Sequence, residues 1–336
     1  MKSVKMLLTS CLLIAAMALS GCGGAEKKPE AKPAAGPQTI KLAHVVNEKD
    51  GFHIAALKFK ELVEARTKGA VKVEVFPNAS LGDERTLIEG MQIGTIAMGV
   101  ITNGPVANFL PEIAAFEMPF MFSSPEEAYK VLDGPVGQKV LAKLDAINLK
   151  GLAYAERGFR NLTNSKKVVK TPADMAGLKI RVMENPVYID TFKTLGTNAV
   201  PMAWTEALTA LQQGTIDGQE NPVNVIYSFK LNETQKYLTM TKHSYAPALF
   251  LMSKKVFGSF NKETQDILMK AAQEAAVHER KWNAEQMAEQ LKALKEKGMQ
   301  ITDPDTAAFQ AAVKPVYDKY GPKFGTLLDD INKAKK

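Results

Sequence analysis

The chain has 336 residues, of which 46% are hydrophobic and 24% are charged, the composition of an ordinary globular protein. Its formal net charge is +7, from 43 Lys and Arg against 36 Asp and Glu, and the basic residues are spread along the chain. Because no dense basic patch is interleaved with aromatic residues, nucleic acid is not an expected partner, and the mild positive charge favours anionic ligands only weakly.

The N-terminal residues predict that the chain is exported. Lys2 and Lys5 precede a largely apolar segment, residues 6–19, in the order typical of a signal peptide. The segment is too short to cross a bilayer, which takes about 20 apolar residues. The Leu-Ser-Gly-Cys sequence that ends at Cys22 resembles the lipobox of bacterial lipoproteins, in which the cysteine takes a diacylglyceryl group and becomes the mature N-terminus. The alternative is an ordinary signal peptide with a chance cysteine.

After a signal peptide over residues 1–21, residues 22–38 are expected to form a lipidated tether. Between Gly23 and Pro37 no hydrophobic side chain is large enough to build a core. Two acyl chains anchor a protein stably where one holds it weakly, so a diacyl anchor is sufficient. The two cysteines of the chain, Cys11 and Cys22, both fall in this N-terminal region. The remaining residues therefore hold no disulfide and no catalytic thiol.

The body of the chain alternates strand-like and helix-like segments. Periodicity predicts strands over residues 40–46, 71–76 and 96–101. It predicts helices over residues 52–67 and 83–93 between them, so the order is βαβαβ and a parallel sheet covered by helices is expected.

One long helix is predicted near the C-terminal end of the body. From Asn261 to about Lys297 the chain is almost free of helix breakers and carries a broken apolar stripe. A single helix of this length would be roughly 55 Å long at 1.5 Å per residue. Such a helix could lie across two lobes.

The common catalytic motifs are missing from the sequence. There is no G-x-S-x-G elbow, no Gly-rich phosphate loop and no H-E-x-x-H. The four histidines lack metal-ligand spacing, so neither a metal nor a cofactor is expected; they are His44, His53, His243 and His278.

Four side chains between residues 158 and 222 have plain structural interpretations on the pattern alone. In Gly-Leu-Lys-Ile-Arg-Val, the alternation places Arg181 on a polar strand face, where a solvated surface arginine is the favoured interpretation. Arg160, followed by turn-forming residues, receives the same interpretation. Trp204 is interpreted as a core aromatic, and Asn221, which precedes a proline, as a helix N-cap.

Three long motifs in this region resemble a known family. They are R-G-F-R-N-L-T-N from Arg157, A-D-M-A-G-L-K-I-R-V from Ala173 and L-G-T-N-A-V-P-M-A-W-T-E-A-L-T-A-L-Q-Q-G-T-I-D-G-Q-E-N-P from Leu195. In this order they resemble the DctP-type solute-binding proteins of tripartite ATP-independent periplasmic (TRAP) transporters. The resemblance implies an α/β, two-lobed, periplasmic-binding-protein-like clamshell with hinge strands and a long spanning helix.

The resemblance also implies the domain organisation and the role of the chain. We expect lobe I to comprise residues 39–157 with 247–286, and lobe II residues 158–246 with 287–330. Outside the cytoplasm, anchored to the cell membrane through lipid on Cys22, the protein is expected to capture a small organic acid. It is expected to deliver this ligand to the TRAP membrane permease.

The family's ligand contacts match residues of this chain. The arginine that ends G-L-K-[IL]-R forms a bidentate salt bridge to the ligand carboxylate and matches Arg181, which reverses the surface interpretation. The arginine of G-F-R-N is a second carboxylate contact and matches Arg160. The asparagine of G-Q-E-N-P and the aromatic residue of P-M-A-[FW] match Asn221 and Trp204. A guanidinium fork suits a carboxylate in a way that a lysine ammonium cannot reproduce.

Departures from the motifs of two branches of the family narrow the range of expected ligands. Where the sialic-acid-binding branch carries a glutamate and an asparagine, this chain has Thr102 and Glu184. The metal-dependent branch ends this region in a T-E-W-type motif instead of Q-E-N-P, so no metal is expected. The remaining expected lining, Val45, Thr102, Met183 and Trp204, is rather apolar and favours an acid with a hydrophobic tail, although a C4-dicarboxylate stays open.

Two other functions stay open at this point. An enzyme would use Glu206, Asp217 or Glu220 as acid or base near Arg181, but no nucleophile or cofactor loop accompanies them. A ligand sensor that presents its closed form to a receptor would have the same fold. Co-purification of a permease or of a sensor kinase discriminates between sensor and transport protein.

Overall fold

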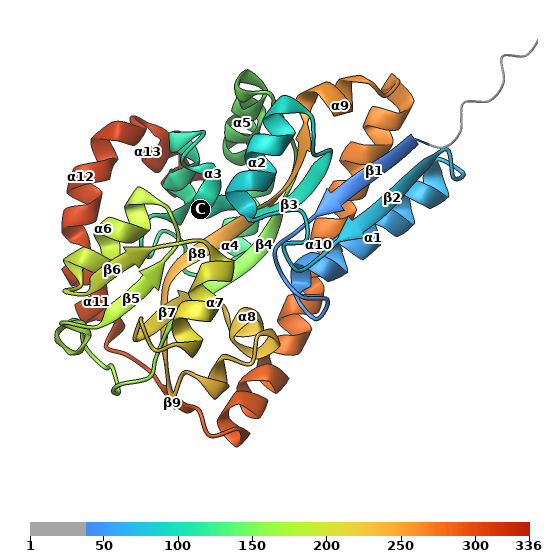
Figure 1. Cartoon of the computed structure of the whole chain (residues 1–336). Coiled ribbons are helices and arrows are strands. Elements are labelled where there is room, and N and C mark those ends of the chain that lie inside the picture. Colours follow the sequence, from blue (N-terminus) through green and yellow to red (C-terminus); the bar gives the residue numbers. More distant parts are fainter. Residues whose placement is uncertain (1–37) are drawn as a thin grey trace, which may run out of the picture. The chain divides into compact units, whose positions relative to one another are not determined.

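The computed structural model describes residues 38–336 (Figure 1). The predicted signal peptide, the lipid site at Cys22 and the tether up to residue 37 lie outside the described residues. The described residues form one compact unit. Among the described helices, none is both long enough and apolar enough to cross a bilayer.

A single mixed sheet of nine strands runs through this unit. Its order is β2-β1-β3-β8-β4-β7-β5-β6, with β9 beside β8. The predicted parallel βαβαβ arrangement is confirmed for β1–β3, whereas the strands at the centre of the sheet pair antiparallel. The strands are β1 (Gln38–Ala43), β2 (Val71–Phe76), β3 (Met98–Thr102), β4 (Leu149–Asn164), β5 (Lys179–Val182), β6 (Asn198–Pro201), β7 (Gly218–Asn221), β8 (Tyr237–Ser253) and β9 (Gln300–Thr302).

Two long strands join the two ends of the sheet. β4 has 16 residues and β8 has 17, and they pair antiparallel along most of their length. β8 also pairs with β3, and β4 also pairs with β7, so both strands pass from the β1–β3 half to the β5–β7 half. The ladder is irregular next to Gly158, whose φ of +104° suits a glycine in a β-bulge. β4 and β8 are the expected hinge strands.

The lobe boundaries stay a prediction, but each falls within an element that passes between the halves. The boundary at residues 157 and 158 lies within β4, and that at 246 and 247 lies within β8. The third, at residues 286 and 287, lies within the long helix α10 (Lys262–Glu296).

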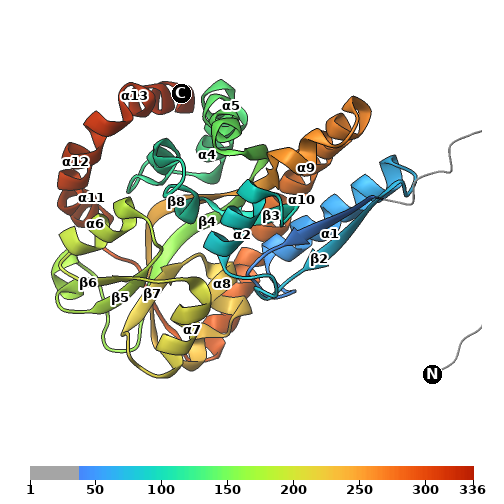
Figure 2. The same cartoon turned by 45° about the horizontal axis from the view of Figure 1, so that its top comes forward.

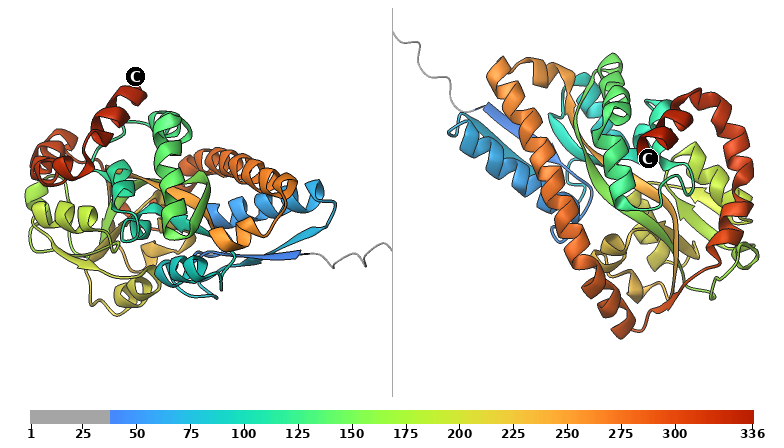
Figure 3. Two further views of the ribbon diagram at one scale, coloured as in Figure 1. Left: turned by 90° about the horizontal axis from the view of Figure 1, so that it is seen from above. Right: turned by 180° about the vertical axis from the view of Figure 1, so that it is seen from behind.

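Helix α10 has 35 residues and confirms the predicted long helix. It begins after Asn261, whose side chain accepts a hydrogen bond from Thr264 N at 2.8 Å. Leu268, Ala271 and Ala275 are buried along one face at helical spacing. The helix contacts α1 in the β1–β3 half and α8 in the β5–β7 half, and it runs along the back of the molecule (Figure 3).

Shorter helices cover the rest of the sheet. The C-terminal helices start beside α6 in the β5–β7 half and return across the molecule, so that α13 packs against α4 and α5 (Figure 2). The shorter α-helices are α1 (Gly51–Arg66), α2 (Glu84–Ile93), α3 (Asn103–Val106), α4 (Pro125–Asp133), α5 (Pro135–Ala142), α6 (Pro186–Thr194), α7 (Trp204–Gln212), α8 (Val223–Ser228), α9 (Lys254–Gly258), α11 (Thr306–Ala312), α12 (Lys314–Phe324) and α13 (Leu327–Lys335).

Candidate functional site

One small cavity lies between the β1–β3 half and the β5–β7 half. Its free volume is about 30 Å³, room for about one water molecule. The structure brings all six predicted ligand-binding residues to its wall: Thr102, Arg160, Arg181, Met183, Trp204 and Asn221. Five residues complete the wall: Val45, Val46, Glu84, Arg157 and Val225.

Arg181 is a buried cation without a carboxylate partner. It lies on β5 between β6 and β7, and only 4% of its surface is exposed. Its Nε and Nη2 donate to the carbonyl oxygen of Met202 at 3.0 and 2.7 Å. No carboxylate of the described residues lies within salt-bridge distance. Burial lowers the pKa of Arg181 to about 10, so the guanidinium stays charged at neutral pH. The surface interpretation of Arg181 is wrong.

Arg160 is held by a buried carboxylate. Its Nε and Nη2 both donate to the carboxylate of Glu220, and Nη2 also donates to the Glu220 carbonyl oxygen at 2.6 Å. Arg160 is 1% exposed, so its surface interpretation is also wrong. Within residues 38–336, Nη1 has no hydrogen-bond partner. Arg160 therefore keeps one nitrogen for a further contact in the cavity.

The pair of Arg160 and Glu220 extends to a histidine. His243 Nε2 lies 3.2 Å from Glu220 Oε2. Burial alone would raise the pKa of Glu220, but the Arg160 charge and the hydrogen bonds from His243 and Arg160 outweigh it and lower the pKa. Glu220, which an enzyme could have used as acid or base, is instead committed to holding Arg160.

Asn221 and Trp204 complete the predicted set. Asn221 ends β7, and its Nδ2 donates to Gln219 Oε1 at 2.6 Å. The N-cap of α8 is Pro222, so the N-cap interpretation of Asn221 is wrong. Trp204 packs edge to face on Phe229, with ring centroids 5.1 Å apart, and also lines the cavity. Its Nε1 is buried and has no partner among the described residues, which leaves a hydrogen-bond donor at the site.

Two charged lining residues were missed by sequence reasoning. Arg157 is bound by Asp50 through two hydrogen bonds of 2.8 and 2.6 Å and lies over the ring of Phe52. Glu84 begins α2, and its Oε1 accepts a hydrogen bond from Thr102 N at 2.6 Å. Burial raises the pKa of Glu84, against the opposing effects of Thr102 and of the neighbouring arginines. These two charged residues join an otherwise rather apolar remaining lining of Val45, Thr102, Met183 and Trp204, so the expected hydrophobic tail of the ligand stays a prediction.

Only weak sequence signals pointed to Arg157 and Glu84 as lining residues. Arg157 is part of the R-G-F-R-N motif, but nothing in the sequence pointed to Asp50 as its partner. An acidic residue in the first turn of a helix is common because it suits the helix dipole, so Glu84 had a sufficient structural explanation.

The two halves touch each other beside the cavity. Asn108 Nδ2 donates to the Glu184 carbonyl oxygen at 2.5 Å, and Asn185 Nδ2 donates to the Gly104 carbonyl oxygen at 3.3 Å. Gly104 fits because a Cβ at this position would lie 2.7 Å from Met183 Cε. These contacts join α3 to the segment between β5 and α6.

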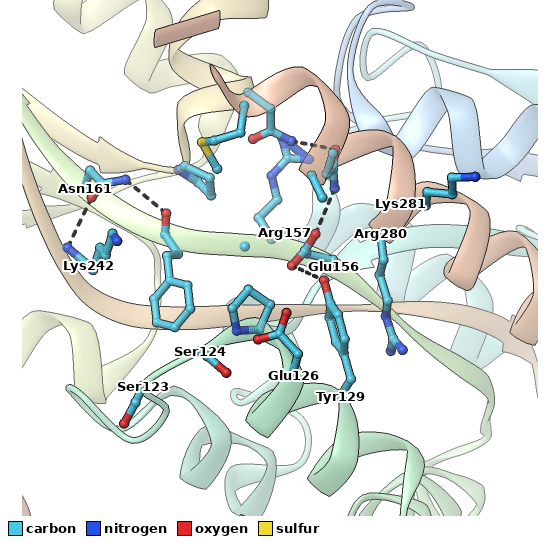
Figure 4. Close-up of a pocket in the computed structure, with 18 of the residues that line it drawn as sticks. Ser123, Ser124, Glu126, Tyr129, Glu156, Arg157, Asn161, Lys242, Arg280 and Lys281 are labelled. Atoms are coloured by element: carbon cyan, nitrogen blue, oxygen red, sulfur yellow. Dashed lines mark hydrogen bonds between the residues drawn. The ribbon is translucent and has the colours of Figure 1, made fainter. Parts of the chain in front are cut away.

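A larger groove, of about 800 Å³, lies between α10 and β4 (Figure 4). Its buried cations are already paired. Arg157 is bound by Asp50, and Arg280 donates two hydrogen bonds to Asp133 at 2.5 and 3.0 Å. Glu156 accepts from the Tyr129 hydroxyl at 2.8 Å. Since no buried cation of this groove lacks a carboxylate partner among the described residues, the smaller cavity is the better candidate for the ligand site.

Within residues 38–336 no cluster of three or more His, Cys, Asp or Glu side chains could hold a metal ion. His44 and His53 lie together, with Nε2 and Nδ1 3.1 Å apart. Burial lowers the pKa of His44 to about 3, so this histidine is neutral at physiological pH.

Comparison with known proteins identifies the family of this chain. Residues 42–323 match the family of bacterial extracellular solute-binding proteins, family 7, known as DctP. The chain belongs to this family. The 2,3-diketo-L-gulonate-binding periplasmic protein of Escherichia coli K12 is 39% identical over 303 residues, which cover 89% of this chain and 92% of that protein.

Two crystal structures of TRAP periplasmic solute-binding proteins show the same fold as this DctP-family chain. One, from Bordetella bronchispeptica with electron density interpreted as pantoate, has a TM-score of 0.87 and 42% identity and covers 89% of this chain and all of that one. The other, from Polaromonas sp. JS666 with bound D-erythronate, has a TM-score of 0.86 and 39% identity. It covers 89% of this chain and 98% of that one.

Family membership confirms several predictions. This DctP-family chain is the extracytoplasmic solute-binding component of a TRAP transporter, with the two-lobed α/β fold of periplasmic binding proteins. It is a binding protein, and the enzyme alternative is wrong.

Proposed function

We propose that this protein captures a small organic acid through the ligand's carboxylate, with Arg181 as the principal contact. The observation that carries the proposal is the distribution of charge in the cavity. Arg157 and Arg160 are paired with Asp50 and Glu220, whereas Arg181 has no carboxylate partner among the described residues. A buried, unpaired charge costs stability, and a ligand carboxylate supplies the missing partner through two parallel hydrogen bonds.

The other predicted residues surround the same ligand in this proposal. The free Nη1 of Arg160 and the orphaned Nε1 of Trp204 are further donors, and Asn221 supplies an amide. Thr102 and Met183 line the wall. The ligands named for the relatives, 2,3-diketo-L-gulonate, pantoate and D-erythronate, are all small carboxylic acids. This supports a carboxylate ligand for the present chain.

Movement of the hinge strands β4 and β8 allows the ligand to bind and to be released. When β4 and β8 flex, the β1–β3 half and the β5–β7 half part and expose Arg181 to the ligand. Closure buries the ligand, and the closed protein delivers it unchanged to the membrane permease of the TRAP transporter.

A thermal-shift screen with a broad organic-acid library tests the proposed function. At a ligand concentration of 100 times Kd, binding stabilises the folded state by about 2.7 kcal/mol. In a protein of this size we expect the matching acid to raise Tm on the order of 5 °C or more. Neutral sugars of the same length serve as controls and are expected to give no shift. If no acid shifts Tm, the proposal is wrong.

We also propose that lipid on Cys22 anchors the mature protein on the extracytoplasmic side of the cell membrane. The support is the basic start, the short apolar segment and the Leu-Ser-Gly-Cys sequence. The anchor would confine the search for the permease to a layer within reach of the tether. Mass spectrometry of the mature protein is expected to show an N-terminal Cys22 with a diacylglyceryl group. An unmodified N-terminus at another residue contradicts the anchor.

A further inference from the structure

The cavity contains one carboxylate that forms no salt bridge with any cation of residues 38–336. Glu84 lines it together with Arg157, Arg160 and Arg181. The charges of Arg157 and Arg160 are balanced by Asp50 and Glu220. Glu84 has no salt bridge within residues 38–336 and lies more than 4 Å from the Arg181 nitrogens. Burial raises the pKa of Glu84, whereas the charges of Arg157 and Arg181 favour its ionised form. One cation and one carboxylate, neither of them in a salt bridge among the described residues, therefore line the same small space.

Glu84 is fixed in place although it has no charged partner. It is the first residue of α2, after Asp83, whose side chain accepts a hydrogen bond from Thr86 N at 2.8 Å. One oxygen, Oε1, accepts from Thr102 N at 2.6 Å at the end of β3. Among the described residues only Thr102 hydrogen-bonds Glu84, so the carboxylate, Oε2 included, keeps lone pairs for a further donor. Glu84 belongs to the β1–β3 half and Arg181 to the β5–β7 half, so closure brings them to one cavity.

The geometry points to Glu84 as the residue that selects a hydroxylated monocarboxylate over a dicarboxylate. This assignment rests on the proposed function, in which Arg181 binds the ligand carboxylate. Glu84 then accepts hydrogen bonds from ligand hydroxyl groups through Oε2. A carboxylate accepts hydrogen bonds and donates none when ionised, so a hydroxyl group satisfies it and a second carboxylate cannot.

The negative charge of Glu84 disfavours a dicarboxylate and also favours a ligand with hydroxyl groups. A dicarboxylate bound at Arg181 would bring its distal carboxylate near Glu84, which among the described lining residues is the other charged group without a salt bridge and is also acidic. Like charges brought together out of water are unfavourable, and a site gains specificity from such a repulsive contact. An acid with a purely hydrophobic tail would leave Glu84 Oε2 desolvated and without a hydrogen bond, which is also unfavourable.

Calorimetric titration with matched acids tests this assignment. Six-carbon aldonates and their aldarates, galactonate with galactarate and gluconate with glucarate, differ only in whether the distal carbon is a hydroxymethyl group or a carboxylate. Hexanoate has the same length without hydroxyl groups. We expect at least one aldonate to bind wild type about 10-fold or more tighter than its aldarate and than hexanoate, the size of one charge-assisted contact.

The variant Glu84→Gln keeps the shape of the side chain and removes its charge. We expect it to bind the aldonate about 10-fold more weakly and to lose most of the discrimination against the aldarate. Glu89→Gln, on the exposed face of the same helix, is the matched control and should keep the wild-type ratio.

The outcomes separate this assignment from the proposed function. If wild type binds the aldonate and Glu84→Gln keeps the same aldonate-to-aldarate ratio, the role of Glu84 is overturned and the proposed function stands. Preference of wild type for the aldarate or for hexanoate also overturns the role of Glu84 alone. If wild type binds none of these acids and no member of the wider library, the proposed function fails and this assignment fails with it.

Discussion

Replacing Arg181 with lysine is expected to weaken binding of the organic acid about 10- to 100-fold, because it removes at least one hydrogen bond to a charged group. A lysine ammonium presents a single point of charge, whereas the guanidinium offers two parallel N–H groups to a carboxylate. In the structure two nitrogens of Arg181 already donate to the Met202 carbonyl oxygen. A lysine that kept this contact would have less to offer the ligand. Isothermal titration calorimetry measures the loss.

The fold of the Arg181→Lys variant should be intact, because Arg181 holds no carboxylate among the described residues. Without ligand, its Tm is expected to lie within a few degrees of wild type. Arg66→Lys serves as the control, since Arg66 pairs with Glu274 at the surface at 2.6 Å and lies outside the cavity. Near-normal binding by Arg181→Lys would show that another cation holds the carboxylate.

The helices and strands that show a local hydrophobic pattern could be predicted from the sequence. β2 spans the predicted residues, and α1, α2 and α10 begin or end within a residue or two of their predicted bounds. Each is an amphipathic element or an alternating strand, so its own residues reveal it. β1 and β3 are shifted from their predicted ranges by a few residues, because strand ends depend on the partner strand.

The antiparallel centre of the sheet could not be predicted in the same way. β4 and β8 are buried along almost their whole length, so they show no alternation of polar and apolar residues. Leu149 pairs with Ser253 and Asn164 with Tyr237, across long stretches of intervening chain. A single sequence does not show such pairing. Only the resemblance to the DctP family implied hinge strands.

Part of the candidate site could likewise be predicted from the sequence, and part could not. The family motifs led to Arg181, Arg160, Asn221 and Trp204, and the structure gathers them at one cavity. Residue patterns alone favoured other interpretations for all four. Thus motif resemblance led to the candidate site, whereas the residue patterns predicted correctly only the core position of Trp204.

The charges that pair with the site residues could not be predicted, because pairing depends on tertiary contacts. Arg160 and Glu220 are 60 residues apart and meet because β4 lies beside β7. Arg157 and Asp50 are 107 residues apart and meet where α1 begins next to β4. These pairs leave Arg181, the arginine to which the family motif had already led, as the cavity arginine without a carboxylate partner among the described residues.

Replacing Glu220 with glutamine is expected to lower the free energy of unfolding by about 3–5 kcal/mol, the cost of leaving a buried charge without its partner. Glu220 is fully buried and holds Arg160 through both carboxylate oxygens. A glutamine presents one oxygen and no charge. Chemical denaturation at pH 7 measures the loss. Affinity for the organic acid should fall too, because Arg160 loses its fixed orientation.

Two further variants test whether the loss of stability in Glu220→Gln comes from the ion pair between Arg160 and Glu220. Glu206→Gln changes an exposed glutamate on α7 with no salt bridge among the described residues, and it should leave the free energy of unfolding within about 0.5 kcal/mol of wild type. Arg160→Met combined with Glu220→Gln removes the unpaired charge, so this double variant should be more stable than Glu220→Gln alone. If the double variant is the less stable of the two, the loss comes from packing and not from the ion pair.

The effect of Glu220→Gln should also depend on pH. The Arg160 charge and the hydrogen bonds hold the pKa of Glu220 in the folded protein below its ordinary value of 4.5, despite burial. The unfolded chain therefore binds the proton more readily, and the stabilisation by Glu220 is complete above the unfolded-state pKa and is lost as pH falls through the folded-state pKa. The difference in unfolding free energy between wild type and Glu220→Gln should be largest near neutral pH and should shrink as the pH falls below 4.5. A difference that stays constant down to acid unfolding would mean that charge pairing with Arg160 is not what Glu220 contributes.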